Sequence, residues 1–394
     1  MTAIIHFYIS DFNKVIKMQK KSERITVITI MIMMLILSVS VIVMPKKDFS
    51  ENENRYLASF PEFSTKTFFS GEYMEKVEGY LTDHFAFRDI WVFIDCEKNI
   101  LMGKCEINGI LIGKDGQLYG SYEEPANTDT ICKILKTFIG QTKENYPDVN
   151  VELMLVPTAL TIYSENLPAD VNVTNQLNTI EYIYQYCEID GIDVSQKLFQ
   201  AKDEKRLYYM TDHHWTTYGA YQGYLAYCES EGLNPVDINS MECVVASEDF
   251  HGTYSSKVNR PFEQGDTIEI YYNPADDLDV YYADEDVMTD TLYNLEYADA
   301  KDKYSLFLDN LHSLIIITNS NADTDRVLLL IKDSYANSMV PFLVANYSKI
   351  YILDTRYYKN GPSFFMTEYE DITDVLILYN LGTMDSDMGL RAIF

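Results

Sequence analysis

An unbroken apolar run from Ile25 to Met44 is the first feature of the hydrophobic pattern along the chain. The run contains no charged residue, no glycine and no proline, and Pro45 follows it directly. About 20 apolar residues are what a helix needs to cross the hydrocarbon core of a bilayer, whereas a surface helix of a soluble domain shows a polar face. The pattern therefore predicts a transmembrane helix over residues 25–44, with a cleaved signal peptide as the alternative.

From residue 108 onward, short apolar runs alternate with stretches of helical periodicity. The apolar runs have the length and β-branched content of buried parallel strands, and they are Val149–Val156, Leu314–Thr318, Val327–Ile331, Ile350–Leu353 and Val375–Tyr379. The helical stretches are Ile131–Asn145, Thr179–Glu188, Thr217–Ser230 and Tyr335–Asn346. Strands that alternate with helices predict an α/β fold, in which a layered sheet carries helices on both faces.

These patterns divide the chain into four parts. Residues 1–24 are a tail, 25–44 the transmembrane helix, 45–107 a helical juxtamembrane segment and 108–394 the α/β domain. In the juxtamembrane segment, apolar residues at helical spacing predict a helix from about Gly71 to Trp91, with breaks. Within the domain, the irregular, acidic and tyrosine-rich stretch at about 250–309 is predicted to be an insertion with small strands such as Thr267–Tyr272.

Charge is distributed unevenly over these parts. The whole chain has a formal net charge of −29, yet residues 1–24 carry five basic and two acidic side chains, a net charge of +3. Because basic flanks of membrane helices stay on the cytoplasmic side, we expect the N-terminus in the cytoplasm and the domain outside the cell. The acidic balance argues against a nucleic-acid partner, since binding to phosphates needs a basic face.

The first candidate site lies in the segment Tyr209–Gly219, which reads YMTDHHWTTYG. Asp212 stands two residues before His214, in a loop that leads into a predicted helix, and a carboxylate at that offset can orient an imidazole and stabilise its charged form. His213 is expected to point to the opposite face and to contact the loop or a substrate. From this segment alone, a structural loop cap or a metal site formed by Asp212, His213 and His214 stays open.

The second candidate site lies where the apolar strand before Asp333 gives way to a predicted helix that begins at Ser334. Open α/β sheets place their sites at the carboxyl ends of strands, and a helix N-terminus offers N–H groups and a dipole for an oxyanion. A plain helix cap is the alternative. Together with Asp212 and His214, Ser334 completes a set suited to acyl transfer, in which the serine is the nucleophile and the histidine its base.

Several separated motifs resemble those of one family. They are Asp-His-His-Trp followed by Thr, the strand that ends in Asp-Ser before a helix, and the upstream pieces ENENRYL-x-x-FP and DHF-x-x-R. The resemblance is to the DHHW family, relatives of the alginate O-acetyltransferases with an SGNH-hydrolase-like fold, and it extends from about Phe49 to Tyr379. It implies that Asp212, His214 and Ser334 form a catalytic triad, and that a multi-pass membrane acyltransferase is a partner.

The sequence also departs from the SGNH pattern. Lys332 stands where SGNH enzymes usually have the glycine of Gly-Asp-Ser, and the separate glycine and asparagine blocks that complete the oxyanion hole are not recognisable. Arg356, His213 and Asn380 are the candidates for oxyanion or substrate contacts, with a surface salt bridge as the alternative for Arg356. No cofactor or metal is expected, and the six cysteines contain no CxxC pair, so they permit disulfides without requiring them.

Three functions are compatible with these features. We favour a membrane-anchored, extracytoplasmic O-acyl (acetyl) transferase that acts on a cell-surface or secreted polysaccharide. A glycan O-acetyl esterase would use the same triad with water as the acceptor. A non-catalytic glycan-binding or assembly protein is the third possibility, motivated by Lys332 and by the unrecognised oxyanion blocks.

Overall fold

The computed structural model describes residues 2–123, 127–169, 171, 173–260, 263–384 and 389–393. Its contacts divide the chain into two compact units, Met1–Glu97 and Lys98–Phe394. They are called the N-terminal unit and the C-terminal unit.

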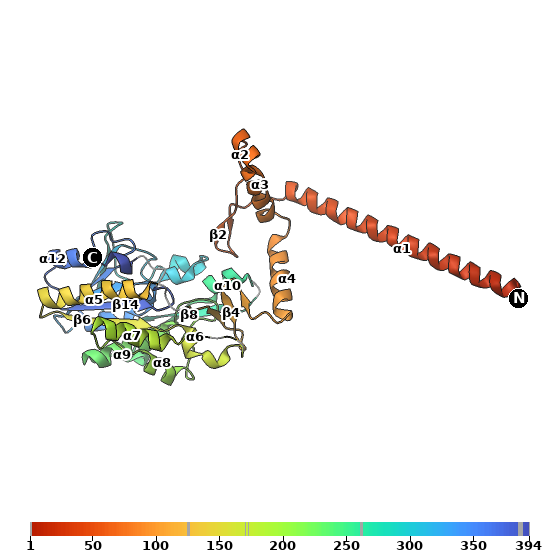
Figure 1. The fold of residues 1–394 in the computed structure, drawn as a ribbon. Helices are drawn as coiled ribbons and strands as arrows, with labels where there is room; N and C mark the ends of the chain where they lie inside the picture. The colour runs from red at the N-terminus through yellow and green to blue at the C-terminus, as the bar shows by residue number, and fades with distance from the viewer. Residues whose placement is uncertain are drawn as a thin grey trace. The chain divides into compact units, whose positions relative to one another are not determined.

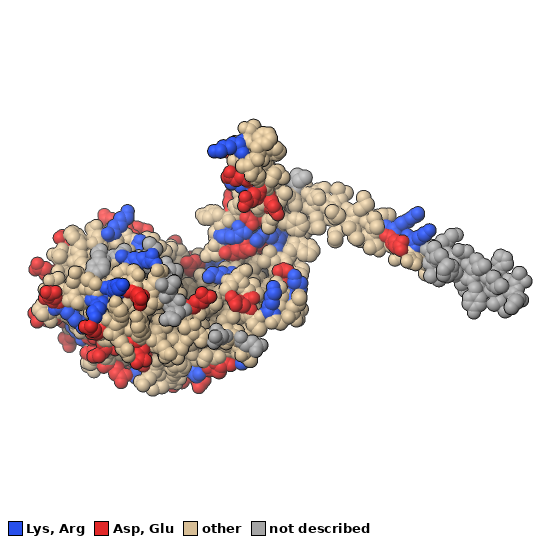
Figure 2. Space-filling view, viewed as in Figure 1, with Lys and Arg blue, Asp and Glu red and all other residues tan. Residues whose placement is uncertain are grey.

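One long helix, α1 (Thr2–Val43), begins the N-terminal unit and is drawn in red in Figure 1. Its part from Met18 to Val41 is long and apolar enough to cross a membrane, and none of this part is buried. Basic side chains gather on α1 at the N-terminal end of this stretch (Figure 2). A helix satisfies its backbone polar groups internally, which is the condition for crossing a bilayer. The helix therefore fits the single-pass anchor predicted for residues 25–44.

Short elements follow α1, and the last of them, α4, extends past the end of the N-terminal unit at Glu97. They are β1 (Phe49–Ser50), β2 (Arg55–Tyr56), α2 (Thr65–Ser70), α3 (Glu72–Asp83) and α4 (Arg88–Leu101). The helix predicted from about Gly71 to Trp91 is broken between α3 and α4, where Phe87 has a φ of 58°. A positive φ of a residue with a side chain is incompatible with a helix interior.

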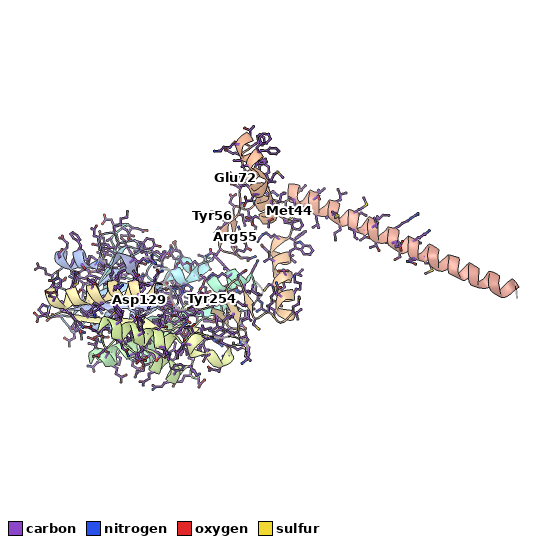
Figure 3. The ribbon with its side chains drawn as sticks, in the orientation of Figure 1. Met44, Arg55, Tyr56, Glu72, Asp129 and Tyr254 are labelled. Atoms are coloured by element: carbon purple, nitrogen blue, oxygen red, sulfur yellow. The ribbon has the colours of Figure 1, made fainter. Side chains whose placement is uncertain are left out.

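Ion pairs join the two upstream sequence motifs in the N-terminal unit. Nη1 of Arg55, labelled in Figure 3, donates to Oδ2 of Asp83 at 3.0 Å. Nη2 of Arg88 donates to Oε1 of Glu53 at 2.8 Å. His84 is bonded through Nε2 to a backbone carbonyl at 2.9 Å. ENENRYL and DHFAFR thus fold against each other, which gives both motifs a structural role.

A seven-stranded sheet forms the centre of the C-terminal unit, in the order β10-β9-β11-β13-β12-β14-β6. Its strands are β6 (Asn150–Val156), β9 (Leu278–Tyr282), β10 (Val287–Thr289), β11 (Leu314–Asn319), β12 (Val327–Lys332), β13 (Lys349–Leu353) and β14 (Asp374–Asn380). Strands β6, β14, β12 and β13 are parallel neighbours. All the apolar runs predicted as strands are present, but the parallel direction predicted for Leu314–Thr318 is wrong, because β11 pairs antiparallel with β13 and β9. An apolar segment predicts a strand that is buried on both faces, but it does not predict the direction of that strand in the sheet.

Two hydrophobic cores lie on opposite faces of this sheet. On β12, Leu328 and Leu330 pack into one core, whereas Leu329 and Ile331 pack into the other, as the alternation of a strand requires. One face is covered by α5 (Thr128–Asn145), α7 (Gln176–Cys187) and α12 (Pro362–Glu368). The other is covered by α6 (Ala159–Ile162), α8 (Ser195–Ala201), α9 (Thr217–Glu231) and α11 (Val340–Leu343). Figure 1 shows α5 (yellow) and α9 (green) with β6 between them, and the predicted layered α/β fold is confirmed.

The helix predicted for Tyr335–Asn346 is not continuous. The segment consists of a 3₁₀ turn η5 (Ser334–Ser338), the short helix α11 and a second 3₁₀ turn η6 (Val344–Asn346). Pro341 lies in the first turn of α11. Proline lacks an N–H and clashes with the preceding turn, so it begins a helix and cannot continue one. The expected long helix with a strong dipole at Ser334 is therefore wrong.

The stretch at about 250–309 is more ordered than the sequence predicted. The predicted strand Thr267–Tyr272 is present as β8 (Asp266–Tyr272), paired with β7 (Glu242–Phe250) in a bulged ribbon. β9 and β10 belong to the central sheet, so this stretch is partly an extension of the sheet and not only an insertion. The remaining elements are α10 (Thr253–Val258), β3 (Glu106–Ile107), β4 (Ile110–Ile112), β5 (Leu118–Gly120), η1 (Ser164–Asn166), η2 (Ile238–Ser240), η3 (Leu295–Asp299), η4 (Lys303–Leu306) and η7 (Leu390–Ala392).

The cysteines form no disulfide in this fold, although Sγ of Cys187 lies 3.7 Å from the backbone oxygen of Cys132. All six are described and all are free thiols, four of them buried.

Candidate active site

The site begins with a hydrogen bond between Ser334 and His214. Ser334 follows β12 at the carboxyl end of the parallel strands, and His214 lies in the loop before α9. Nε2 of His214 is 2.8 Å from Oγ of Ser334, although the residues are 120 positions apart in the chain. The fold thus brings together the two segments that the sequence singled out.

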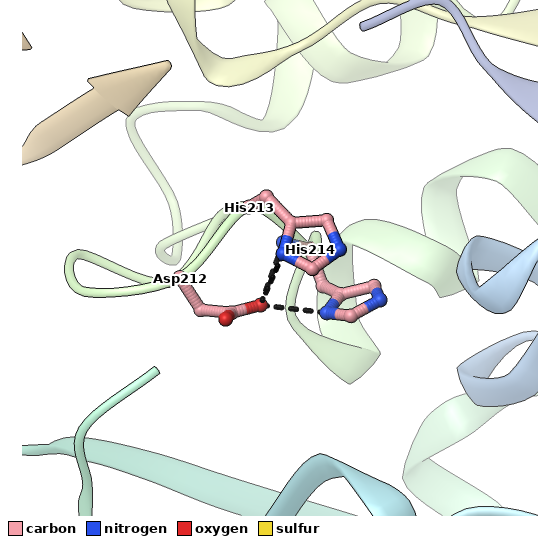
Figure 4. A group of neighbouring side chains, drawn as sticks. All are labelled: Asp212, His213 and His214. Atoms are coloured by element: carbon pink, nitrogen blue, oxygen red, sulfur yellow. Dashed lines mark hydrogen bonds and ion pairs between the residues drawn. The ribbon is translucent and has the colours of Figure 1, made fainter. Parts of the chain in front are cut away.

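Asp212 continues this chain of contacts on the other side of the imidazole. Its Oδ1 lies 2.6 Å from Nδ1 of His214 and also accepts the backbone N–H of His214 at 3.0 Å. Figure 4 shows the carboxylate facing the ring nitrogens of both histidines. The acceptor on Nδ1 assigns the ring proton to that nitrogen, which leaves the Nε2 lone pair for the hydroxyl of Ser334. Hydroxyl, imidazole and carboxylate therefore form one continuous relay.

Burial and charge set the protonation of this relay. Burial and then the charge of His213 lower the pKa of His214 to about 4, against the opposing effect of Asp212. Burial alone would raise the pKa of Asp212, but the two histidines outweigh it and hold that pKa well below its usual range. A neutral imidazole beside an ionised carboxylate is the form that a general base requires.

His213 does not point away from this site as the sequence predicted. Its Nδ1 lies 3.3 Å from Oδ1 of Asp212 and 2.9 Å from Oγ1 of Thr253, and the two histidine rings are 3.8 Å apart. The loop bends here, so the alternation of an extended strand does not apply. Burial opposes protonation of His213, but Asp212 outweighs it and raises the pKa of His213 above its ordinary value.

Asp212, His213 and His214 are also a group that could hold a metal ion, because their ligand atoms lie within 4.8 Å of one another. Ligands about 2.0 Å from a tetrahedral zinc would lie roughly 3.3 Å apart. The 2.6 Å between Oδ1 of Asp212 and Nδ1 of His214 is shorter, and it is a hydrogen-bond distance. The arrangement fits a proton relay better than a ligand shell.

Buried bonds tie the two segments of the site together. Nε1 of Trp215 donates to the backbone oxygen of Tyr335 at 2.9 Å, and the hydroxyl of Tyr335 donates to the backbone oxygen of His213. Both aromatic side chains are fully buried. The tryptophan of the DHHW segment therefore fixes the serine turn against the histidine loop.

Residues from the stretch at about 250–309 also support the site, and they were not predicted from the sequence. The backbone N–H and Oγ1 of Thr253 donate to Oδ2 of Asp212 at 2.7 and 3.0 Å. Asp266 accepts the backbone N–H groups of Met210 and Thr211, both at 2.8 Å. These contacts depend on tertiary packing, and the letters HGTYSSK gave no periodic signal that could have indicated them.

The remaining candidates lie beside the relay. Arg356 forms a two-pronged ion pair with the fully buried Asp354, at 2.8 and 2.5 Å, and its charge is a minor contribution to the lowered pKa of His214 after burial and His213. Asn380, at the end of β14, donates its backbone N–H to Oδ2 of Asp333 at 2.7 Å. Its side-chain Nδ2 is buried and has no hydrogen-bond partner among the described residues.

Lys332, the residue in place of the usual glycine, is buried behind the serine turn. Its Nζ lies 2.7 Å from Oδ1 of Asn337 and 3.9 Å from Oδ2 of Asp354. Together with Arg356, Lys332 balances the charge of the buried Asp354, and through Asn337 it stabilises the turn that carries Ser334.

The DHHW family model matches residues 119–353, which is more than half of the chain and includes all three residues of the relay. The chain belongs to the DHHW family. A search of curated protein sequences gives no match.

Solved structures include similar folds. A DHHW family protein from Eubacterium siraeum is 25% identical, with a TM-score of 0.62 over 73% of this chain and 96% of that one. PatB1 from Bacillus cereus, solved with a sulfonyl adduct, is 20% identical, with a TM-score of 0.59 over 71% of this chain and 97% of that one. The O-acetyltransferase domain of Pseudomonas putida AlgJ is 14% identical, with a TM-score of 0.44 over 70% and 92%. This DHHW protein therefore shares its layered α/β fold with the Eubacterium siraeum protein and with PatB1.

Proposed function

We propose that this DHHW protein is a membrane-anchored O-acyl (acetyl) transferase that modifies a polysaccharide through Ser334, His214 and Asp212. The observation that carries the proposal is the continuous relay from Oγ of Ser334 through the imidazole to the carboxylate, at 2.8 and 2.6 Å. A serine in hydrogen-bond reach of a base that a third group orients is the arrangement of an activated nucleophile.

The reaction takes place in two halves. In the first, Nε2 of His214 takes the hydroxyl proton while Oγ of Ser334 attacks the acyl carbonyl, and the leaving group of the donor departs with that proton. In the second, His214 takes the proton of a sugar hydroxyl, whose oxygen attacks the acyl-serine ester and restores the serine. Asp212 stays ionised and stabilises the imidazolium in both halves.

Asn380 and Arg356 are proposed to face the charge that develops on the acyl oxygen. The buried Nδ2 of Asn380 without a partner is a donor that costs free energy until an acceptor reaches it. The guanidinium of Arg356 is held in place by Asp354 and contributes positive charge near the base. Both are donors of the kind that stabilise an oxyanion. His213, whose side chain is 25% exposed, is proposed to contact the substrate.

The proposed place of work is the outer side of the cell membrane. The apolar part of α1 supports a membrane anchor, and the basic residues before it favour a cytoplasmic N-terminus. A polysaccharide as acceptor, and a multi-pass membrane acyltransferase as the source of acyl groups, follow from the family resemblance.

Turnover of an activated acetyl ester by the full-length chain in detergent tests this proposal. We expect release of the leaving group by the wild type, loss of that release in Ser334→Ala, and wild-type rates in Ser348→Ala. Ser348 is a matched control because its Oγ bonds to the backbone oxygen of Arg326, at the opposite end of β12. Turnover by Ser334→Ala at the wild-type rate would contradict the proposal.

Adding an oligosaccharide acceptor separates transfer from hydrolysis. Acetylated oligosaccharide in the products supports a transferase, and free acetate alone indicates an esterase with the same site. Glycan binding without any turnover indicates the non-catalytic alternative.

A further inference from the structure

An aromatic ring lies flat against the imidazole of His214. The ring of Tyr304, in η4, is 3.7 Å from the ring of His214 between centroids, with an angle of 7° between the planes. Tyr304 is 4% exposed. Such a parallel contact covers one face of the imidazole and excludes water from it.

The hydroxyl of the same tyrosine reaches the serine turn. It lies 3.1 Å from the backbone oxygen of Ser334 and 3.1 Å from Oγ of Ser338. Burial raises the pKa of Tyr304, so the phenol keeps its proton and acts as a donor. One side chain therefore touches both the base and the segment that carries the nucleophile.

The stacking partner of Tyr304 is the base of the relay, which sets this contact apart from the stacked pairs of the core. One such core pair is Phe365 with Tyr369, at 20°, and edge-to-face contacts are also common between neighbouring aromatic residues. Tyr304 makes an edge-to-face contact with Tyr209, at 83°, whereas the flat face of its ring lies against His214. The face of an aromatic ring attracts a cation, and His214 becomes a cation each time it takes a proton from Ser334 or from an acceptor.

We propose that Tyr304 is a positioning residue of the active site, with two roles that belong to different parts of its side chain. Its ring holds the plane of the imidazole and stabilises the imidazolium, and its hydroxyl holds the backbone of Ser334 in line with Nε2. This inference rests on the proposed function. It also makes the stretch at about 250–309 a required part of the site, since Tyr304 and Thr253 both come from it.

Two substitutions separate the roles. Tyr304→Phe keeps the ring and removes the hydroxyl, whereas Tyr304→Leu keeps apolar volume and removes the aromatic face. The measurement is the pH profile of kcat/KM for an activated acetyl ester with the full-length chain in detergent. The groups that surround His214, namely Asp212, His213, Arg356 and Tyr335, are the same in both variants.

For Tyr304→Phe we expect a fall of about threefold in kcat/KM with an unchanged acid limb, because a neutral hydrogen bond is lost. For Tyr304→Leu we expect a fall of about tenfold or more. Its acid limb should also move down by roughly half a pH unit, because the imidazolium loses its facing ring. Tyr293→Leu is the control, since Tyr293 is a buried tyrosine of the same stretch that bonds to Tyr271 and packs on Phe307. It should lower the melting temperature but leave the pH profile unchanged.

Equal pH profiles for Tyr304→Leu and Tyr293→Leu would overturn the inference. If the two pH profiles are equal but Ser334→Ala abolishes turnover in the same assay, only the role of Tyr304 is overturned and the proposed function still holds. If Ser334→Ala is as active as the wild type, the proposed function itself fails. Melting temperatures of all variants separate a misfolded protein from a folded protein with a misplaced base.

Discussion

Thr253 holds Asp212 with two donors at once, since its backbone N–H and its hydroxyl both point to Oδ2 of the carboxylate, at 2.7 and 3.0 Å. Oδ1 is left to the histidines. One carboxylate oxygen of Asp212 thus accepts hydrogen bonds from Thr253, which holds it in place, while the other contacts the histidines. Such supporting contacts fix the orientation of the group that in turn orients the base.

Removing the hydroxyl of Thr253 tests this support. Thr253→Val keeps the side-chain shape but removes the donor to Asp212 and the partner of Nδ1 of His213. We expect kcat/KM for an acetyl ester to fall about tenfold, the effect of one hydrogen bond to a charged group. Thr253→Ser should restore most of the activity. Wild-type kinetics in Thr253→Val would show that the backbone N–H alone holds the carboxylate.

Gly252 packs so closely on the same carboxylate that a side chain has no space. A Cβ on Gly252 would lie 2.3 Å from Oδ2 of Asp212, whereas its φ of −80° is open to any residue. Gly252→Ala should therefore displace Asp212 and reduce kcat/KM about a hundredfold. The control is Gly140→Ala on α5, where nothing lies within 4 Å of the new Cβ. The Gly140→Ala control should keep full activity. If Gly252→Ala is as active as this control, the result contradicts the packing argument.

The pH dependence of kcat/KM should report the pKa of His214. Because only the neutral imidazole can accept a proton, kcat/KM should fall as the pH drops through about 4, the pKa of His214. The charge of His213 is the second-largest cause that lowers this pKa. His213→Gln should therefore move the acid limb to higher pH. A limb that stays in place or moves down in this variant would show that the histidines do not interact electrostatically.

Glu152 predicts a pH-dependent stability away from the site. Burial and then the charge of Glu231 raise its pKa from 4.5 to about 7. Because the pKa of Glu152 is higher in the folded than in the unfolded state, its protonation stabilises the fold. This contribution to the free energy of unfolding is fully present below about pH 4.5 and is lost as the pH rises through about 7. Glu152→Gln should therefore raise the melting temperature at about pH 9 by roughly 1 to 3 °C, a modest effect because the side chain is only partly buried.

The matching measurement at about pH 5 should show little or no gain for Glu152→Gln. Glu144→Gln, at an exposed position of α5, should show no gain at either pH. The same gain for Glu152→Gln at both values would mean that packing and not charge is responsible.

The sequence predicted the scaffold better than the details of the site. Apolar runs such as Val327–Ile331 identify strands because burial on both faces requires them to be apolar throughout. The direction of β11 was wrong because a buried run does not encode its direction. The long helix predicted after Ser334 was wrong because Pro341 interrupts a segment whose apolar spacing is otherwise helical.

The three residues of the relay could be predicted from the sequence, but the residues that hold them in place could not. Asp212, His214 and Ser334 stood out because each residue type is required by the chemistry and each lies at the end of a predicted element. Thr253 and Tyr304 touch them only through tertiary packing, and threonine and tyrosine are common in that stretch. His213 was misplaced because a bent loop does not alternate its side chains as a strand does.

Covalent labelling of Ser334 by a sulfonyl fluoride tests the central claim most directly. In this reaction Oγ forms a bond to sulfur and fluoride leaves, so only an activated nucleophile reacts quickly, and the mass of the full-length protein reports the adduct. We expect one adduct per chain on the peptide that contains Ser334, no adduct in Ser334→Ala, and much slower labelling in His214→Gln. Labelling of Ser334→Ala to the same extent, or equal rates in His214→Gln and the wild type, would contradict the account.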